Sequence, residues 1–144
     1  MTELLGNRVL FVPLLAWAVS QSIKVLLNYW WERKLDLRHL VAAGGMPSSH
    51  SALVAALTTA IARQAGLGSP LFGAAVIFST IVMYDAAGVR RTVGRHARVL
   101  NLLLDEMFVR HQLDEARLRE LVGHTPVQVV AGATLGVVLA VLFA

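Results

Sequence analysis

The chain has 144 residues, of which 56% are hydrophobic and only 15% are charged, and its mean hydropathy is +0.63. This composition excludes an ordinary soluble domain and favours a single membrane-embedded domain over residues 1–144. The chain has no cysteine, which excludes disulfides and thiolate metal sites, and its net charge of +4 comes with no nucleic-acid recognition motif, so we expect no nucleic-acid partner.

Four apolar segments are predicted to be transmembrane helices, because a span needs about 20 mostly apolar residues. In chain order they cover residues 9–31, 49–64, 70–87 and 126–144. Segment 49–64 is the weakest, since it is short and alanine-rich, which suits a helix packed inside a bundle. The first apolar run is followed by Trp, Gln and Lys instead of small residues, so we expect no cleaved signal peptide. The expected fold class is all-α, an integral membrane helical bundle.

A polar stretch separates the third and fourth spans. Within it the run RHARVLNLLLDEMFV, residues 95–109, has apolar residues at helical spacing. This pattern predicts an amphipathic helix that lies at the membrane interface or against the bundle.

Basic residues are concentrated on one side of this topology. Four spans place residues 32–48 and 88–125 on one side, with both termini and residues 65–69 on the other. Ten of the 13 Lys and Arg fall on the first side: Arg33, Lys34, Arg38, Arg90, Arg91, Arg95, Arg98, Arg110, Arg117 and Arg119. The positive-inside rule makes this side cytoplasmic, and we expect a plasma (inner) membrane protein, although arginines held in an active site would also bias the count.

Three short polar strings fall at membrane ends that face this same side. They are GGMPSSH, YDAAGVRR and GHTP, at residues 44–50, 84–91 and 123–126. Although 74 positions separate His50 from His124, the topology lets the strings converge. The sequence therefore predicts one shared polar site.

The string GGMPSSH suits phosphate binding by the backbone. Gly45 allows main-chain N–H groups to approach an anion closely, and Pro47 fixes the entry into the next helix. Ser48 and Ser49 precede that helix, where unpaired N–H groups and the positive dipole end attract phosphate.

The other strings provide positive charge and proton transfer. Arg90 and Arg91 can form forked bonds to phosphate oxygens, and Lys24 within the first span is by default a functional candidate. His50 and His124 ionise near neutral pH, which suits one nucleophile and one proton donor. Together these groups are those that an enzyme of phosphoryl transfer needs, and they predict that reaction.

Each group also has a plainer interpretation. The serines of PSSH can simply cap a helix, and GHTP can be a loop before a proline at a helix start. The arginine pair can anchor a helix at lipid headgroups, and Lys24 can extend its amine to the interface. Asp85 can pair with an arginine. The remaining histidines lie among charged loop residues and are expected to be solvated: His39, His96 and His111.

The strings GGMPSSHSALVAAL, VMYDAAGVRRTVGRHARVLN and ELVGHTPVQVVAGATLG resemble the divergent branch of the type 2 phosphatidic acid phosphatase (PAP2) family, related to the vanadium-dependent haloperoxidases. The resemblance covers residues 8–144. It implies an α-helical membrane phosphatase that acts on a lipid phosphate or diphosphate without a metal or other cofactor, and for which vanadate is an inhibitor that mimics phosphate.

The resemblance also implies roles for individual residues. The family's phosphate-binding proline, serine, glycine and histidine motif matches Pro47, Ser48, Ser49 and His50, with serine in place of glycine. The string GHTPVQVVAG makes His124 the nucleophile that forms a phosphohistidine. Gln128 stands where the family has an aspartate, and its carbonyl can accept the ring N–H without adding a charge.

Two other family positions are not matched. The first motif, a lysine followed by arginine and proline, is absent, and Lys24 and Arg33 are only candidates for its role. The family arginine that precedes the nucleophile falls on Leu118, flanked by Arg117 and Arg119. We therefore assign the anion-binding task to the arginine pair of GVRR.

The sequence thus predicts a membrane phosphatase acting on phosphatidate, phosphatidylglycerophosphate or an isoprenyl diphosphate at the cytoplasmic interface. Its expected partners are the lipid phosphate and the bilayer, and an oligomer is left open. One alternative is a catalytically weak or inactive anionic-lipid binding or transport protein, which Gln128 and the missing first motif favour. Another is a structural membrane subunit that uses the small-residue run AGATLG as a packing face.

Overall fold

The structure is a computed structural model that describes residues 6–32, 45–108 and 124–144. Its long helices in chain order are α2 (Arg8–Glu32), α3 (Ser49–Ala65), α4 (Pro70–Ala87), α5 (Val89–Phe108) and α6 (Pro126–Phe143). These described ranges contain no strand, and the all-α prediction is confirmed.

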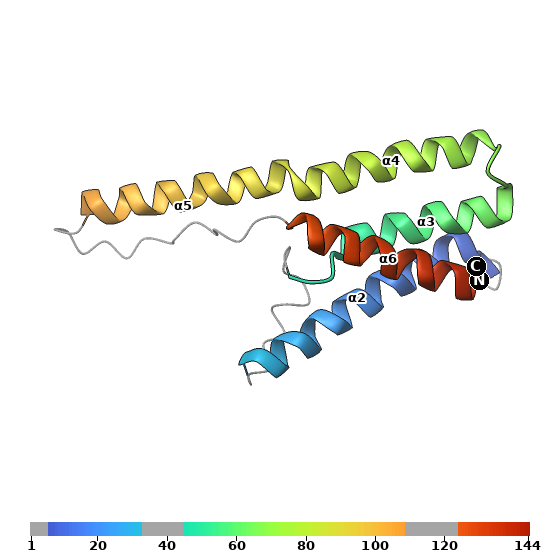
Figure 1. Cartoon of the computed structure of the whole chain (residues 1–144), viewed down its shortest axis with the longest axis horizontal. Helices are drawn as coiled ribbons and strands as arrows, with labels where there is room; N and C mark the ends of the chain where they lie inside the picture. Colours follow the sequence, from blue (N-terminus) through green and yellow to red (C-terminus); the bar gives the residue numbers. More distant parts are fainter. Residues whose placement is uncertain (1–5, 33–44, 109–123) are drawn as a thin grey trace.

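Helix α3 lies at the centre of the bundle. Helices α2, α4 and α6 each pack directly against it, and α2 also packs against α6. Figure 1 shows α4 and α2 on opposite sides of the α3 and α6 pair. No Cα atom of α2 lies within 8 Å of one in α4. The start of α2, the end of α6 and the turn between α3 and α4 share one end of the bundle, as the predicted topology requires (Figure 1).

Two glycines let α6 approach α3 at backbone distance. A Cβ atom added to Gly132 would lie 2.2 Å from the carbonyl oxygen of Ser48, and one added to Gly136 would lie 2.2 Å from that of Ala52. Lipid is as apolar as leucine, so membrane helices associate through close packing of small residues instead of through a hydrophobic driving force. The run AGATLG is therefore a packing face, and it is used within the chain.

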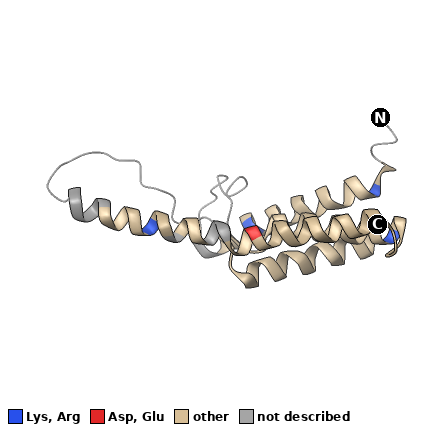
Figure 2. Cartoon of the chain, turned by 90° about the horizontal axis from the view of Figure 1, so that it is seen from above, with Lys and Arg blue, Asp and Glu red and all other residues tan. Residues whose placement is uncertain are grey.

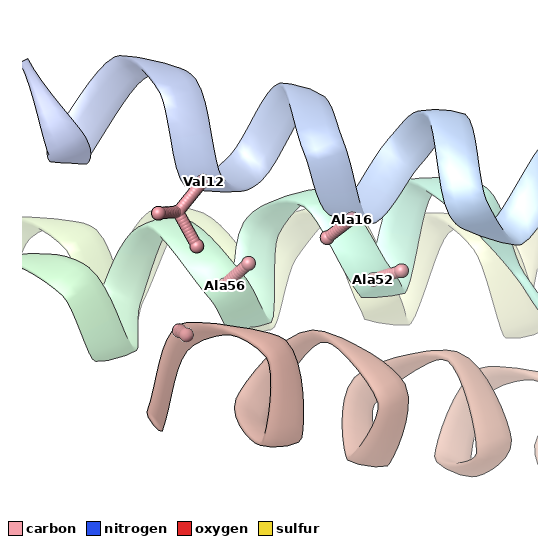
Figure 3. Packing of buried hydrophobic residues seen from close by; sticks show 5 residues of the cluster. Val12, Ala16, Ala52 and Ala56 are labelled. Carbon is pink, nitrogen blue, oxygen red and sulfur yellow. The ribbon is translucent and has the colours of Figure 1, made fainter. Parts of the chain in front are cut away.

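The buried core between α2, α3 and α6 is built from similarly small side chains. It consists of Val12, Ala16, Ala52, Ala56 and Ala140, all fully buried. Figure 3 shows Val12 and Ala16 of α2 directed at Ala52 and Ala56 of α3. Because alanine loses no side-chain entropy, this packing costs little beyond fixing the backbone.

The starts of α3, α4 and α6 are set by local sequence. Ser48, Ser69 and Thr125 are N-caps, each accepting a backbone N–H three residues further on. Pro70 and Pro126 occupy the start of α4 and α6, where the missing N–H has no helical partner to lose. Capping signals in the sequence therefore fix where these helices begin.

The apolar helices make this a membrane protein. Three described stretches are long and apolar enough to cross a membrane: Arg8–Trp30, Pro70–Leu103 and Pro126–Phe143. Helix α3 has 17 residues, which at 1.5 Å per residue gives about 25 Å, and it is the most enclosed helix. It matches the segment that the sequence marked as short and internal. Figure 2 shows that few positions along the coloured helices are Lys, Arg, Asp or Glu.

Helix α5 differs from its prediction in extent and direction. It begins at Val89 and continues the line of α4 away from the bundle, and it contacts no described helix other than α4 (Figure 1). Of the two predicted positions, the one against the bundle is not the one observed among the described helices, and the one at the membrane interface stays a prediction. The reason is local: Gly88 has helical dihedrals, donating to Tyr84 and accepting from Thr92, so the backbone ladder is not broken between the two helices.

We expect Gly136→Leu to destabilise the bundle strongly, because the new side chain meets a backbone carbonyl that cannot move aside. The cost should exceed the roughly 1–3 kcal/mol of ordinary overpacking. Thermal unfolding in detergent micelles measures it. Gly73→Leu is the matched control, since nothing lies within 4 Å of a Cβ at that position. Equal unfolding midpoints for the two variants would contradict the packing described.

Candidate functional site

Two backbone hydrogen bonds bring the predicted strings together at one end of the bundle. The N–H of Ser48 donates to the carbonyl of Gln128 at 3.0 Å, which joins the start of α3 to the first turn of α6. The N–H of His124 donates to the carbonyl of Ala86 at 3.0 Å, which joins the residue before Thr125 to the end of α4. The convergence that the topology predicted is thus present for these helix ends.

The two histidines lie side by side at this junction. Their ring centroids are 6.1 Å apart and the ring planes are inclined by 59°. His124 is 2% exposed, whereas His50 in the first turn of α3 is half-buried. At this separation the rings do not stack face to face, and both can reach the same small group beside them.

A buried lysine contacts the residue that precedes His50. Lys24 is 6% exposed, and its Nζ donates a hydrogen bond of 3.0 Å to the Oγ of Ser49. A charge inside a span is costly and marks a functional candidate by default, and the amine of this lysine is directed to the first residue of α3. When protonated, the lysine adds its positive charge to the partial positive charge of the α3 N-terminus.

The loop that leads into α3 is closely packed. Gly45 has a φ of +81°, in the left-handed region that glycine tolerates, and a Cβ there would lie 3.8 Å from the Cδ of Lys24. Ser48 is fully buried and caps α3, since its Oγ accepts from the N–H of Ser51 at 3.3 Å and from its hydroxyl at 3.0 Å. The two serines therefore differ: Ser48 caps the helix and Ser49 faces the lysine.

Gln128 has a role that the sequence did not predict. Its Oε1 accepts the backbone N–H of Thr125 at 2.9 Å, and its own N–H donates to the Oγ1 of Thr125 at 3.4 Å. The pair is a reciprocal capping box, which fixes the first turn of α6 directly after His124. Gln128 thus fixes the backbone directly after His124, and the bond to the histidine ring that the resemblance suggested stays a prediction.

The remaining predicted residues are placed less fully. Asp85 is half-buried in the last turn of α4, next to the carbonyl that holds His124. Arg90 and Arg91 belong to the first turn of α5, but their side chains lie outside the described part of the structure. His96 is exposed on α5, as predicted. Other candidates lie in ranges that are not described: Arg33, His39, His111, Arg117, Leu118 and Arg119.

Sequence reasoning missed polar residues of α2 that accompany Lys24. Ser20 is fully buried and donates to the carbonyl of Trp17 at 3.0 Å, and Gln21 is also buried. Gln21, Lys24 and Asn28 recur at helical spacing, so they share one face of α2. Polar residues at that spacing within an apolar span were a usable signal, because intramembrane polar groups face the bundle interior.

The arrangement is suited to holding an anion beside two imidazoles. Lys24, Ser49 and the start of α3 supply positive charge and hydrogen-bond donors at the end of a largely apolar bundle. Low local dielectric strengthens such interactions. The described residues contain no group of three or more His, Cys, Asp or Glu that could hold a metal ion.

Comparison with known proteins identifies the family. The chain belongs to the Divergent PAP2 family, whose sequence pattern matches residues 5–139. It is 41% identical over 153 aligned positions to the uncharacterized membrane protein YuiD of Bacillus subtilis strain 168, across 99% of this chain and 97% of that protein. No solved structure matches significantly. The family resemblance of the three strings is thereby confirmed.

We expect Thr125→Ala to lower the free energy of unfolding by about 1 kcal/mol, because the first turn of α6 loses its hydroxyl cap. The thermal midpoint in detergent micelles measures the loss. Thr134→Ala serves as the matched control, since that hydroxyl bonds back to the carbonyl of Val130 within α6 and caps nothing. A larger effect at Thr134 than at Thr125 would contradict the role of the capping box.

Proposed function

We propose that this member of the Divergent PAP2 family is a membrane phosphatase that hydrolyses a lipid phosphate or diphosphate through a phosphohistidine intermediate. The proposal is carried by the His50 and His124 pair, 6.1 Å between centroids, together with the bond from Lys24 to Ser49, the residue before His50. Family membership supports it. Phosphatidate, phosphatidylglycerophosphate and isoprenyl diphosphates are the substrate types we propose.

In the first step His124 attacks phosphorus. A ring nitrogen of neutral His124 forms the N–P bond while the bond from phosphorus to the leaving oxygen breaks. Protonated His50 gives its proton to that oxygen, so a monoester releases a lipid alcohol and a diphosphate releases a lipid monophosphate. His124 is suited to this task because its burial and its backbone bond to Ala86 restrict the ring's position.

In the second step water attacks the phosphohistidine. His50, now neutral, accepts a proton from the water, the N–P bond breaks, and inorganic phosphate leaves. Lys24, Ser49 and the start of α3 hold the phosphate oxygens through both steps, and Arg90 and Arg91 are proposed to join them. Fixed positive donors supply most of the rate enhancement in phosphoryl transfer, because the protein does little covalent chemistry for the group in flight.

We place this site at the cytoplasmic face of the plasma membrane. The end of the bundle that carries the histidine pair is also the end at which ten of the 13 basic residues fall in the predicted topology. Cytoplasmic loops carry such an excess of Lys and Arg.

The second candidate function is an anionic-lipid binding protein with weak or no catalysis. It is favoured by Gln128, whose amide oxygen accepts a backbone N–H in the capping box and brings no charge to the ring of His124. Without that charge a developing imidazolium is less stabilised. Both candidates share the anion site and differ only in the covalent step.

We expect His124→Ala to abolish phosphate release and His50→Ala to lower its rate by about 10²–10⁴-fold, the usual contribution of a general acid. The assay measures inorganic phosphate from phosphatidate and from isoprenyl diphosphate in detergent micelles. An alkaline quench tests for phosphohistidine, which should be absent from His124→Ala. His96→Ala is the control, because His96 is exposed on α5. Release that persists unchanged in His124→Ala would sink the proposal, and anion binding without any release would favour the second candidate.

We expect Lys24→Met to abolish the stabilisation of the protein by vanadate. A ligand that binds only the folded state stabilises it by about 2.7 kcal/mol at 100 times its Kd, and without the cation at this site the affinity falls. Thermal unfolding with and without vanadate measures the shift. Arg63→Met is the matched control, since Arg63 donates to the carbonyl of Val141 on another helix, away from the site. A vanadate shift that survives in Lys24→Met and disappears in Arg63→Met would contradict the assignment.

A further inference from the structure

In the described part of the structure, one face of α3 lies between the contacts that this helix makes with α2 and with α4. Ala52 and Ala56 belong to the core shared with α2 and α6. On another side, the hydroxyl of Ser79 on α4 donates to the carbonyl of Val54 at 3.1 Å and lies 2.6 Å from the hydroxyl of Thr58. Helices α2 and α4, which flank α3, do not come within 8 Å of each other between Cα atoms. Among the described helices only α2, α4 and α6 pack against α3, so none of them joins α2 to α4 across the face of α3 between these two contacts.

Two leucines and one catalytic candidate occupy this face. His50, Leu53 and Leu57 recur at positions i, i+3 and i+7, which places them on one line along a helix. All three are half-buried, whereas the small residues on the α2 side, among them Ala56, are buried. We name these three residues the α3 stripe. It extends about 10 Å from the histidine pair toward the middle of the membrane, at 1.5 Å per residue.

We propose that the α3 stripe binds the first part of the hydrocarbon chain of the lipid substrate. This inference rests on the proposed function. His50 protonates the leaving oxygen, and in a lipid monoester that oxygen is bonded to the lipid, so the chain must start beside His50. Leu53 and Leu57 provide an apolar surface that starts at that point. The substrate chain can make van der Waals contacts with this surface in place of other lipids, and no polar group is exposed.

The position of the cation favours the same orientation. Lys24 and Ser49 lie toward α2, on the side of α3 next to the stripe. A phosphate held there, with its chain along Leu53 and Leu57, keeps the scissile bond next to His50. The phosphate end of the lipid then contacts the polar surface at Lys24 and Ser49, and its chain contacts the apolar surface of the stripe. Polar groups placed beside an apolar surface fix the orientation of a ligand in small-molecule sites.

A steric variant tests the stripe through activity. We expect Leu57→Trp to lower kcat/KM for a long-chain phosphatidate by about tenfold or more, while kcat/KM for a short-chain, water-soluble phosphatidate stays unchanged. Ile77→Trp is the control, since Ile77 lies midway along α4 and is 65% exposed. An equal fall for both substrates, or no fall for the long-chain one, would overturn the proposal.

Photolabelling of the unmodified protein tests the stripe without relying on catalysis or on folding of a variant. The probe is a phosphatidate with a photoreactive group in one acyl chain close to the glycerol, and peptide mass spectrometry locates the label. Label on α3 between Leu53 and Leu57 supports the proposal, and label confined to the outer faces of α4 or α6 overturns it. Label on α3 without phosphate release would refute the proposed function and support the α3 stripe as a lipid site. Phosphate release with label elsewhere would support the proposed function and refute the stripe.

Discussion

The contact on which this structure depends is the approach of the α6 backbone to that of α3. Gly132 and Gly136 make it possible, since a Cβ at either position would lie 2.2 Å from a carbonyl oxygen of α3. Within lipid there is no hydrophobic gain from burying one apolar helix against another, so close packing must supply the stability. The same contact builds the site: Gly132 packs on the carbonyl of Ser48, and the N–H of Ser48 bonds to the carbonyl of Gln128. The residue that caps α3 is thereby fixed against the helix that follows His124.

Polar groups inside this bundle form hydrogen bonds that reduce the free-energy cost of burying them. Lys24 is the extreme case, a buried ammonium in a span, and its bond to Ser49 offsets only part of the desolvation. A hydrophobic residue of similar length would give a more stable bundle, as replacement of buried charges often does. A lysine at this position therefore fits a requirement for positive charge at the start of α3 better than a requirement for stability.

The parts of this structure that sequence reasoning could reach are those governed by local rules. Span composition, the hydroxyl caps and the prolines at helix starts follow from short stretches of chain, and the predicted sidedness allowed His50 and His124 to converge. Contacts that depend on the rotation of one helix against another were out of reach. No pattern indicates that the amine of Lys24 meets Ser49 instead of Ser48, because that choice depends on how α2 turns against α3. The capping role of Gln128 was also not predicted, although Thr125 and Gln128 have the local spacing of a capping box, and the oxygen of Gln128 accepts the N–H of Thr125.

The separation of the two histidines depends on all three helices that meet at the site. His50 belongs to α3, while His124 is bonded to the end of α4 through Ala86 and leads directly into α6. A displacement of α4 along α3 would therefore move one imidazole relative to the other. The hydroxyl pair of Thr58 and Ser79 resists such sliding, because it joins α3 to α4 at 2.6 Å inside the bundle, where no water competes for the bond. Hydrogen bonds between membrane helices are individually modest, about 0.6 kcal/mol on average. At this position the bond between Thr58 and Ser79 fixes the register of α4 against α3, and this register keeps the two histidine rings within reach of one small group.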